Sequence, residues 1–74
     1  MNKTIADSTD FGNALRTRRK QLGYTQAYLA EFTGFSVSFI SDLENGKPTA
    51  ELGKALHLAN LLALNCTLTP RGKS

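Results

Sequence analysis

Two short segments on either side of Gly34 constrain the fold of this chain more than any other feature of its sequence. Residues 26–33 and 36–46 each have apolar residues only where two crossed helices would touch. Leu29 supplies that contact in the first segment, and Leu43 supplies it near the end of the second. Gly34 suits the turn between them, because glycine adopts a positive φ without a Cβ clash. The sequence therefore predicts two short helices joined by a tight turn.

The second of these helices has an outward face made of small or polar side chains. A helix held across a partner helix in this way is the arrangement that places side chains in the DNA major groove. We therefore interpret five residues as candidates for contact with DNA bases: Ser36, Val37, Ser38, Ser41 and Asp42.

Chain length, net charge and cysteine content limit the classes of protein to which this chain can belong. A chain of 74 residues is one small domain, near the size at which oligomerisation often adds the stability that a single core lacks. The net charge of +3 favours a polyanionic partner without requiring one, and the basic residues Arg16, Arg18, Arg19 and Lys20 can also be ordinary solvated surface. We find no bilayer-spanning run and no signal segment, so we expect a cytoplasmic protein without membrane contact. The single Cys66 allows no internal disulfide.

Helix signals divide the chain into a folded part and two tails. Residues 1–7 lack periodicity and are predicted to form a flexible tail. Ser8 or Thr9 can cap the first helix. Residues 8–63 are then predicted to form an all-α domain of four to five helices, and residues 71–74 form a second flexible tail.

Thr25 and Ser36 are the predicted N-caps of the two short helices, because a hydroxyl oxygen accepts hydrogen bonds from the free amides of a first turn. The second short helix is expected to end at Asn45 and Gly46. Lys47 then lies in a loop.

A fourth helix, from about Ala50, carries more leucine than one buried face needs. Its predicted core face consists of Leu52, Ala55, Ala59 and Leu62, whereas Leu58 and Leu61 fall on a second apolar face. Because a domain of this size needs only one buried face per helix, we interpret the surplus as a subunit interface.

The segment that follows alternates in polarity, which predicts a β-strand over residues 64–70. A lone strand cannot satisfy its backbone groups, and a second copy of the chain in a two-fold dimer is the simplest partner. A disordered tail is the alternative. The predicted dimer interface comprises Leu58, Leu61, Leu62, Leu64, Cys66 and Leu68.

Five motifs occur in order between residues 8 and 62: Leu15-Arg16-x-Arg18-Arg19, Gly23-Tyr24-Thr25-Gln26, Leu29-Ala30, Gly34-Phe35-Ser36 and Ile40-Ser41-x-Leu43-Glu44-Asn45-Gly46-Lys47. Together they resemble the Cro/CI-type (XRE-like) helix-turn-helix family, whose domain is lambda-repressor-like. Residues 39–49, with a terminal strand after the last helix, are more narrowly similar to HipB-type antitoxin repressors. The resemblance implies a homodimer that binds a palindromic double-stranded DNA operator and represses its own operon, with terminal strands paired across the dimer. It also implies a HipA-like kinase toxin as a candidate partner.

The resemblance assigns phosphate contacts to four residues. Thr25 and Gln26 match the start of the helix that contacts the DNA backbone in the family. Asn45 and Lys47 match the phosphate contacts that follow the recognition helix.

Arg19 and Glu44 match a partly buried ion pair that ties the first helix to the end of the recognition helix. Removing one partner of such a pair costs about 3–5 kcal/mol, because it leaves a buried charge without compensation. The resemblance therefore implies that Arg19 is structural rather than part of a basic patch.

The recognition helix departs from the family pattern at Val37 and Ser38, where many relatives have Gln, Arg or Lys. Long polar side chains make bidentate base contacts worth about 1–3 kcal/mol each, and this face lacks them. Asp42 can accept from a cytosine amine or contact the protein's own groups. Because direct base readout is expected to be weak, a second function stays open: a protein-binding antitoxin or adaptor that neutralises a partner and retains only residual DNA binding.

Catalysis has little support in the sequence. His57 and Cys66 are the only residues of their kinds, and no third group is indicated. We find no paired carboxylates, no Gly-rich phosphate loop and no metal-ligand set. The sequence therefore predicts a protein that is not an enzyme and needs no cofactor.

Overall fold

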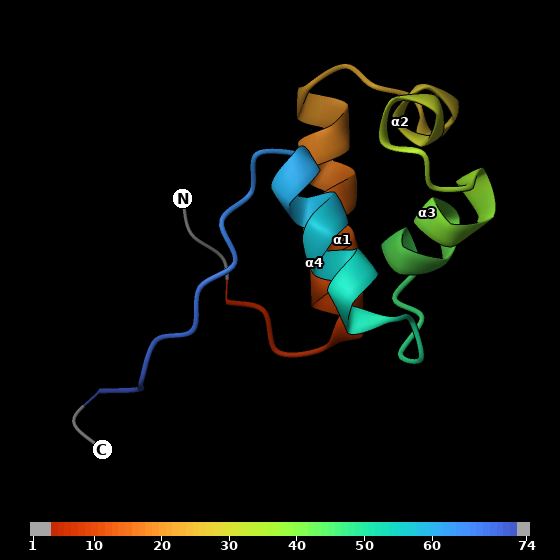
Figure 1. The fold of residues 1–74 in the computed structure, drawn as a ribbon. Helices are drawn as coiled ribbons and strands as arrows, with labels where there is room; N and C mark the ends of the chain where they lie inside the picture. The colour runs from red at the N-terminus through yellow and green to blue at the C-terminus, as the bar shows by residue number, and fades with distance from the viewer. Residues whose placement is uncertain (1–3, 73–74) are drawn as a thin grey trace.

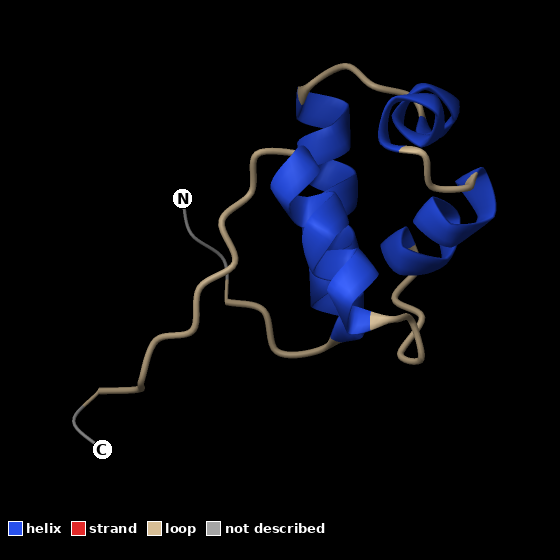
Figure 2. Cartoon of the chain, viewed as in Figure 1, coloured by secondary structure: helices blue, strands red, loops and turns tan. Residues whose placement is uncertain are grey.

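A computed structural model describes residues 4–72, and this range contains four α-helices and no β-strand (Figure 1, Figure 2). The helices are α1 (Ser8–Gln21), α2 (Gln26–Thr33), α3 (Val37–Glu44) and α4 (Leu52–Leu61). The all-α prediction is confirmed for these residues. None of the helices in this range is long and apolar enough to cross a membrane. The outer parts of the two predicted tails, residues 1–3 and 73–74, lie outside the described residues.

The start of α1 differs from the prediction, since Asp7 is its N-cap rather than Ser8 or Thr9. The Asp7 carboxylate accepts a hydrogen bond from the backbone amide of Asp10 at 2.8 Å. Ser8 is engaged elsewhere, because its hydroxyl donates to the carbonyl oxygen of Gly46 at 2.8 Å. The first turn of α1 is thereby tied to the turn that follows α3.

The two short helices form over the predicted residues. Thr25 accepts a hydrogen bond from the Tyr28 amide and Ser36 accepts one from the Phe39 amide, both at 3.0 Å. Gly34 between the helices has a φ of 84°, a conformation that glycine adopts without strain. α3 packs against both α1 and α2, so that the turn holds the two short helices at an angle (Figure 1).

α1 approaches the end of α3 very closely at Gly12. A Cβ atom on this residue would overlap the carbonyl oxygen of Leu43 and lie 2.8 Å from that of Glu44. The absence of a side chain therefore sets the separation of the two helices, and with it the position of α3.

One hydrophobic core joins the four helices. Its buried members are Leu15, Leu29, Ile40, Leu43, Ala55, Leu58, Ala59 and Leu62. The buried face of α4 keeps the predicted Ala55, Ala59 and Leu62 but takes Leu58 in place of Leu52, which is 68% exposed. Residues 55, 58, 59 and 62 follow the spacing of a single helical stripe, and the core takes that stripe. The assignment of Leu58 and Leu62 to a subunit interface is therefore wrong.

The predicted strand over residues 64–70 does not form in the described part of the single chain. The segment leaves α4 and runs away from the helices (Figure 2). Leu64 at its start packs against the core, whereas Cys66 and Leu68 are exposed. A strand needs a second strand for its backbone groups, and residues 4–72 offer none. Pairing across a dimer stays a prediction.

A hollow of about 360 Å³ lies between the outer surface of α4 and the tail. Its lining residues are Leu52, Leu56, Asn60, Cys66, Thr67 and Leu68. The leucines among them are exposed in the single chain, and Leu68 is wholly so. The outer face of α4 and the tail therefore carry exposed apolar surface in the single chain.

Candidate nucleic-acid interface

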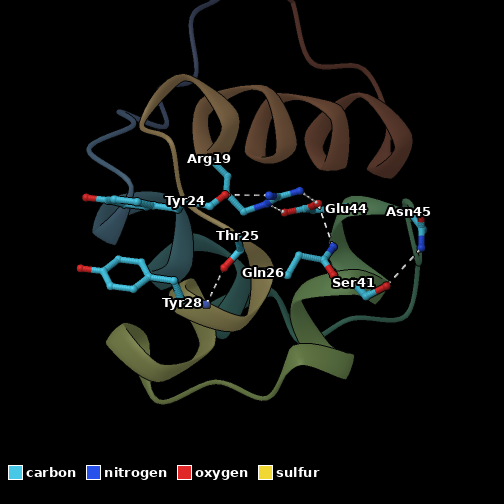
Figure 3. Close-up of polar contacts among 8 residues, drawn as sticks. All are labelled: Arg19, Tyr24, Thr25, Gln26, Tyr28, Ser41, Glu44 and Asn45. Atoms are coloured by element: carbon cyan, nitrogen blue, oxygen red, sulfur yellow. Dashed lines mark hydrogen bonds and ion pairs between the residues drawn. The ribbon is translucent and has the colours of Figure 1, made fainter.

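A buried ion pair joins α1 to the end of α3. Arg19 Nε lies 2.7 Å from Glu44 Oε2, and Arg19 Nη2 donates to Glu44 Oε1 at 2.9 Å (Figure 3). Arg19 Nη1 also donates to the carbonyl oxygen of Tyr24 at 2.8 Å. Only 8% of Arg19 and 5% of Glu44 is exposed. The pair therefore fixes α1, the loop before α2 and the end of α3 relative to one another.

The surroundings of the pair keep both groups ionised. Burial raises the pKa of Glu44, but the hydrogen bonds from Arg19 and Gln26 and the positive charges of Arg19 and Arg16 outweigh it, so that the pKa lies below its ordinary value. The hydrogen bond to Glu44 raises the pKa of Arg19 against the opposing effect of burial. Arg19 is thus committed to the interior and is not a surface charge.

Gln26, the first residue of α2, binds the same carboxylate. Its Nε2 donates to Glu44 Oε1 at 3.0 Å, which turns the amide nitrogen toward the ion pair (Figure 3). Because an amide nitrogen has two protons, one remains for an external acceptor. This bond could not be predicted from the sequence, since 18 positions separate the two residues and only the packing of α2 on α3 brings them together.

The start of α2 lies beside the end of α3. Figure 3 shows the Gln26 side chain beside Glu44 and Ser41 of α3, whereas the ring of Tyr28 points to the other side. The first amides of a helix lack intrahelical partners and carry the positive end of the helix dipole, so this position attracts anions. The start of α2 is therefore suited to a phosphate group.

The outward face of α3 presents short side chains. Val37 is 44% exposed, and Ser36 and Ser38 are also exposed. The Ser36 oxygen serves as the N-cap of α3. Ser41 and Asp42, one turn further along, are half-buried. The accessible start of α3 thus offers methyl groups and hydroxyls rather than long polar side chains.

The residues that follow α3 contact this same face. Asn45 Nδ2 donates to Ser41 Oγ at 3.4 Å, and Lys47 Nζ lies 3.4 Å from Asp42 Oδ2. Of the two roles left open for Asp42, the structure therefore contains the contact with the protein's own lysine.

Two of the four basic residues on α1 (Arg16, Arg18, Arg19 and Lys20, here the basic cluster) bind groups of the protein itself. Arg18 Nε donates to the carbonyl oxygen of Leu62 at 2.8 Å, which satisfies a backbone group at the end of α4. Together with the buried Arg19, this leaves Arg16 and Lys20 as the exposed members of the cluster. The position of Arg18 in the apolar stripe of α1, between Leu15 and Leu22, was the available signal for its structural role.

The described residues contain no metal centre, since no three His, Cys, Asp or Glu side chains gather within residues 4–72. His57 is exposed, and its ring lies edge-on at 6.0 Å from that of Phe35. Phe39 on α3 packs against the core, with its ring 5.0 Å from that of Phe35. The aromatic residues around α3 therefore support its position.

Comparison with known proteins identifies relatives of this arrangement. The sequence model of the family described as Helix-turn-helix (HTH_3) matches residues 15–68. The uncharacterised HTH-type transcriptional regulator y4mF of Sinorhizobium fredii (strain NBRC 101917 / NGR234) is 41% identical over 68 residues, which cover 92% of this chain and 87% of that protein. The competence pilus inhibition repressor of Acinetobacter baylyi (strain ATCC 33305 / BD413 / ADP1) is 42% identical over 60 residues. That match covers 81% of this chain and 53% of the repressor.

Solved structures of HipB have the same fold. A chain of the HipB-O4 20mer complex superposes with a TM-score of 0.84 at 30% identity, over 96% of this chain and 100% of that chain. A chain of the HipA-HipB-O2-O3 complex gives a TM-score of 0.85 at 30% identity, again over 96% of this chain and 100% of the other. The chain therefore belongs to the Cro/CI-type, XRE-like helix-turn-helix family of transcriptional regulators.

Proposed function

We propose that this protein binds a two-fold symmetric DNA operator as a homodimer and represses transcription, including that of its own operon. The observation that carries the proposal is the junction at Glu44, which holds Arg19 of α1 and Gln26 of α2 by bonds of 2.7 to 3.0 Å. This junction sets the exposed face of α3 beside the start of α2. The groups proposed to face bases and those proposed to face phosphates then lie on one surface of the protein. Helix-turn-helix proteins that place the second helix in the major groove have this arrangement.

In this arrangement four residues contact phosphates. Thr25 and Gln26 do so at the start of α2, and Asn45 and Lys47 do so after the end of α3. The methyl groups of Val37 suit a thymine methyl, while hydroxyls suit either donor or acceptor edges. Because such contacts are few, paired half-sites and DNA shape supply the rest of the sequence preference. The residues that face the bases are Ser36, Val37, Ser38, Ser41 and Asp42.

The homodimer is supported by apolar surface that a single chain leaves uncovered. Leu52 and Leu56 on α4 are exposed beside the exposed Leu68 of the tail. Pairing of residues 64–70 with the same segment of a second copy would satisfy backbone groups that one chain cannot. A two-fold axis here would place the two α3 helices in successive major grooves, about 34 Å apart.

A protein partner is supported by the likeness to HipB, which one solved complex contains together with HipA. We include a HipA-like kinase toxin as the partner of this protein, which would make it the antitoxin of the pair. The short side chains Val37 and Ser38 on α3 favour a second candidate function, in which neutralising such a partner is the main role and DNA binding is residual.

The test is selection of a duplex from a random DNA library, followed by titration of that duplex and a scrambled one across a salt series. A repressor should select a two-fold symmetric site, bind it as two protomers and lose affinity steeply with salt, by a slope of about 0.9 per phosphate contact. Equal and weak binding to both duplexes would contradict the repressor and leave the protein partner as the main function.

The Gln26→Ala variant tests the phosphate role within this proposal. Loss of a hydrogen bond to a charged group should weaken binding to the selected and scrambled duplexes alike, by about tenfold. Gln21→Ala, at the exposed end of α1, is the matched control and should bind as the unaltered protein does. A loss confined to the selected duplex would contradict a phosphate role and indicate base contact instead.

A further inference from the structure

Both residues that follow α3 and are proposed to contact phosphates touch a residue proposed to face the bases. Asn45 Nδ2 donates to Ser41 Oγ and Lys47 Nζ contacts Asp42 Oδ2, each at 3.4 Å. The backbone enforces this arrangement, because the amides of Asn45 and Lys47 donate to the carbonyl oxygens of Ser41 and Asp42 at 3.0 Å. Gly46, with a φ of 82°, makes the turn that brings Lys47 back over the helix.

These two side-chain contacts are weak enough to be exchanged. The Lys47 and Asp42 side chains are 51% and 46% exposed, and 3.4 Å is long for a charged hydrogen bond. Exposed pairs of this kind add little to stability. A DNA phosphate can therefore compete with Asp42 for the Lys47 ammonium group, in contrast to the buried Arg19–Glu44 pair.

When Lys47 moves from Asp42 to a phosphate, the Asp42 carboxylate loses its partner. What this carboxylate then contacts decides whether the exchange is favourable. Asp42 lies on the surface of α3 that is proposed to enter the major groove, among the negative charges of DNA. It gains only where a base offers a hydrogen-bond donor, as the amino group of cytosine does. Without a donor, an uncompensated carboxylate opposes binding, and opposition to the wrong sequence raises specificity as effectively as attraction to the right one.

We propose that Asp42 determines DNA specificity through its pairing with Lys47. On a duplex without an amino group at the matching position, Asp42 retains Lys47 and withholds its charge from the phosphates. On a duplex with that group, Asp42 binds the base and Lys47 moves to a phosphate. This inference rests on the proposed DNA-binding function and adds a residue that opposes binding to the wrong sequences as well as favouring the right one.

The experiment measures dissociation constants by fluorescence anisotropy, across a salt series, for the selected duplex and a scrambled duplex of equal composition. Asp42→Asn should raise affinity for the scrambled duplex by about threefold and steepen its salt slope by about one phosphate contact, because Lys47 is released. The same variant should lower affinity for the selected duplex by about fivefold or more. The double variant with Lys47→Ala and Asp42→Asn should bind the scrambled duplex no more tightly than Lys47→Ala alone.

Glu51→Gln is the matched control. It removes the same charge from a second exposed pair, Glu51 with Lys54 at 3.8 Å, which belongs to the start of α4 rather than to α3. Specificity should not change in this variant. If Asp42→Asn and Glu51→Gln raise affinity for both duplexes equally, the effect is net charge and the proposed role of Asp42 is overturned.

Two other outcomes overturn the proposal in distinguishable ways. If Asp42→Asn binds both duplexes as the unaltered protein does, Asp42 has no role in specificity while DNA binding stands. If the unaltered protein shows no salt-dependent binding to any duplex, the DNA-binding function fails and this inference fails with it. Thermal unfolding of each variant should show that the fold is retained, as expected for exposed side chains.

Discussion

The carboxylate of Glu44 accepts three hydrogen bonds, two from Arg19 and one from Gln26, which come from different helices. Each bond favours the ionised carboxylate, and together they overcome its burial. Because a buried charge without its partner is expensive, this residue links the stability of the domain to the geometry of the candidate DNA interface. At the scale of single residues, the Glu44 carboxylate therefore contributes both to folding and to the proposed function.

The depressed pKa of Glu44 makes a prediction about stability and pH. A carboxyl group whose pKa is lower in the folded than in the unfolded protein stabilises the fold above its unfolded value of about 4.3. That contribution is lost as the pH falls through the folded-state pKa. The free energy of unfolding, measured by urea titration, should therefore fall with decreasing pH below about 5.

Glu44→Gln isolates the contribution of this group. The variant should be less stable at neutral pH by about 3 kcal/mol, since Arg19 loses its charged partner. It should also show a shallower loss of stability in acid, whereas Glu31→Gln, on the exposed face of α2, should keep the steep dependence. Equal acid dependence in the unaltered protein and in Glu44→Gln would assign the effect to other carboxylates.

At the scale of elements, the packing of α1 on α3 depends on a missing side chain. Gly12 leaves no room for a Cβ atom against the backbone of Leu43 and Glu44. Ser8 and Gly46 join the same two helices at their ends through a hydrogen bond of 2.8 Å. The position of α3, and therefore of its outward face, depends on this close backbone contact as well as on the Arg19–Glu44 pair.

Two glycine substitutions test this packing. Gly12→Ala should lower the free energy of unfolding by about 2 kcal/mol, because the methyl group forces the helices apart. Gly53→Ala, in α4 with open space around it, should instead stabilise by up to ~1 kcal/mol through helix propensity. Chemical denaturation of both variants checks the pair, and similar effects from the two substitutions would rule out the close approach as the cause.

The whole molecule leaves apolar surface exposed along α4 and the tail. Leu64 packs against the core, whereas Leu56 and Leu68 are exposed and line the hollow between α4 and the tail. The packed part of the single chain therefore ends near Leu64, and the residues beyond it are exposed. The proposed dimerisation would cover this surface.

Deletion of residues 65–74 tests the role of this segment. The truncated protein should remain folded, since Leu64 is kept, and should shift toward monomer in sedimentation velocity. The full chain with Leu68→Glu should shift in the same direction, because this fully exposed side chain belongs to the proposed interface. A dimer that persists in both would remove residues 65–74 from the interface.

The local signals of the sequence determined much of this protein. Thr25, Gly34 and Ser36 placed the two short helices correctly, because capping and positive φ depend on neighbouring residues alone. The motifs indicated the family for a similar reason, since each consists of residues at fixed, short spacings along the chain. The four-helix, all-α architecture followed from these local patterns.

What only the tertiary structure decided concerns groups that are distant in sequence. Periodicity permitted more than one buried stripe on α4, and packing buried Leu58 instead of Leu52. The burial of Leu58 and Leu62 in the core excluded both from the interface. The bond from Gln26 to Glu44 and that from Arg18 to the carbonyl of Leu62 join residues 18 and 44 positions apart. Such contacts depend on how the helices cross, which is a property of the core as a whole.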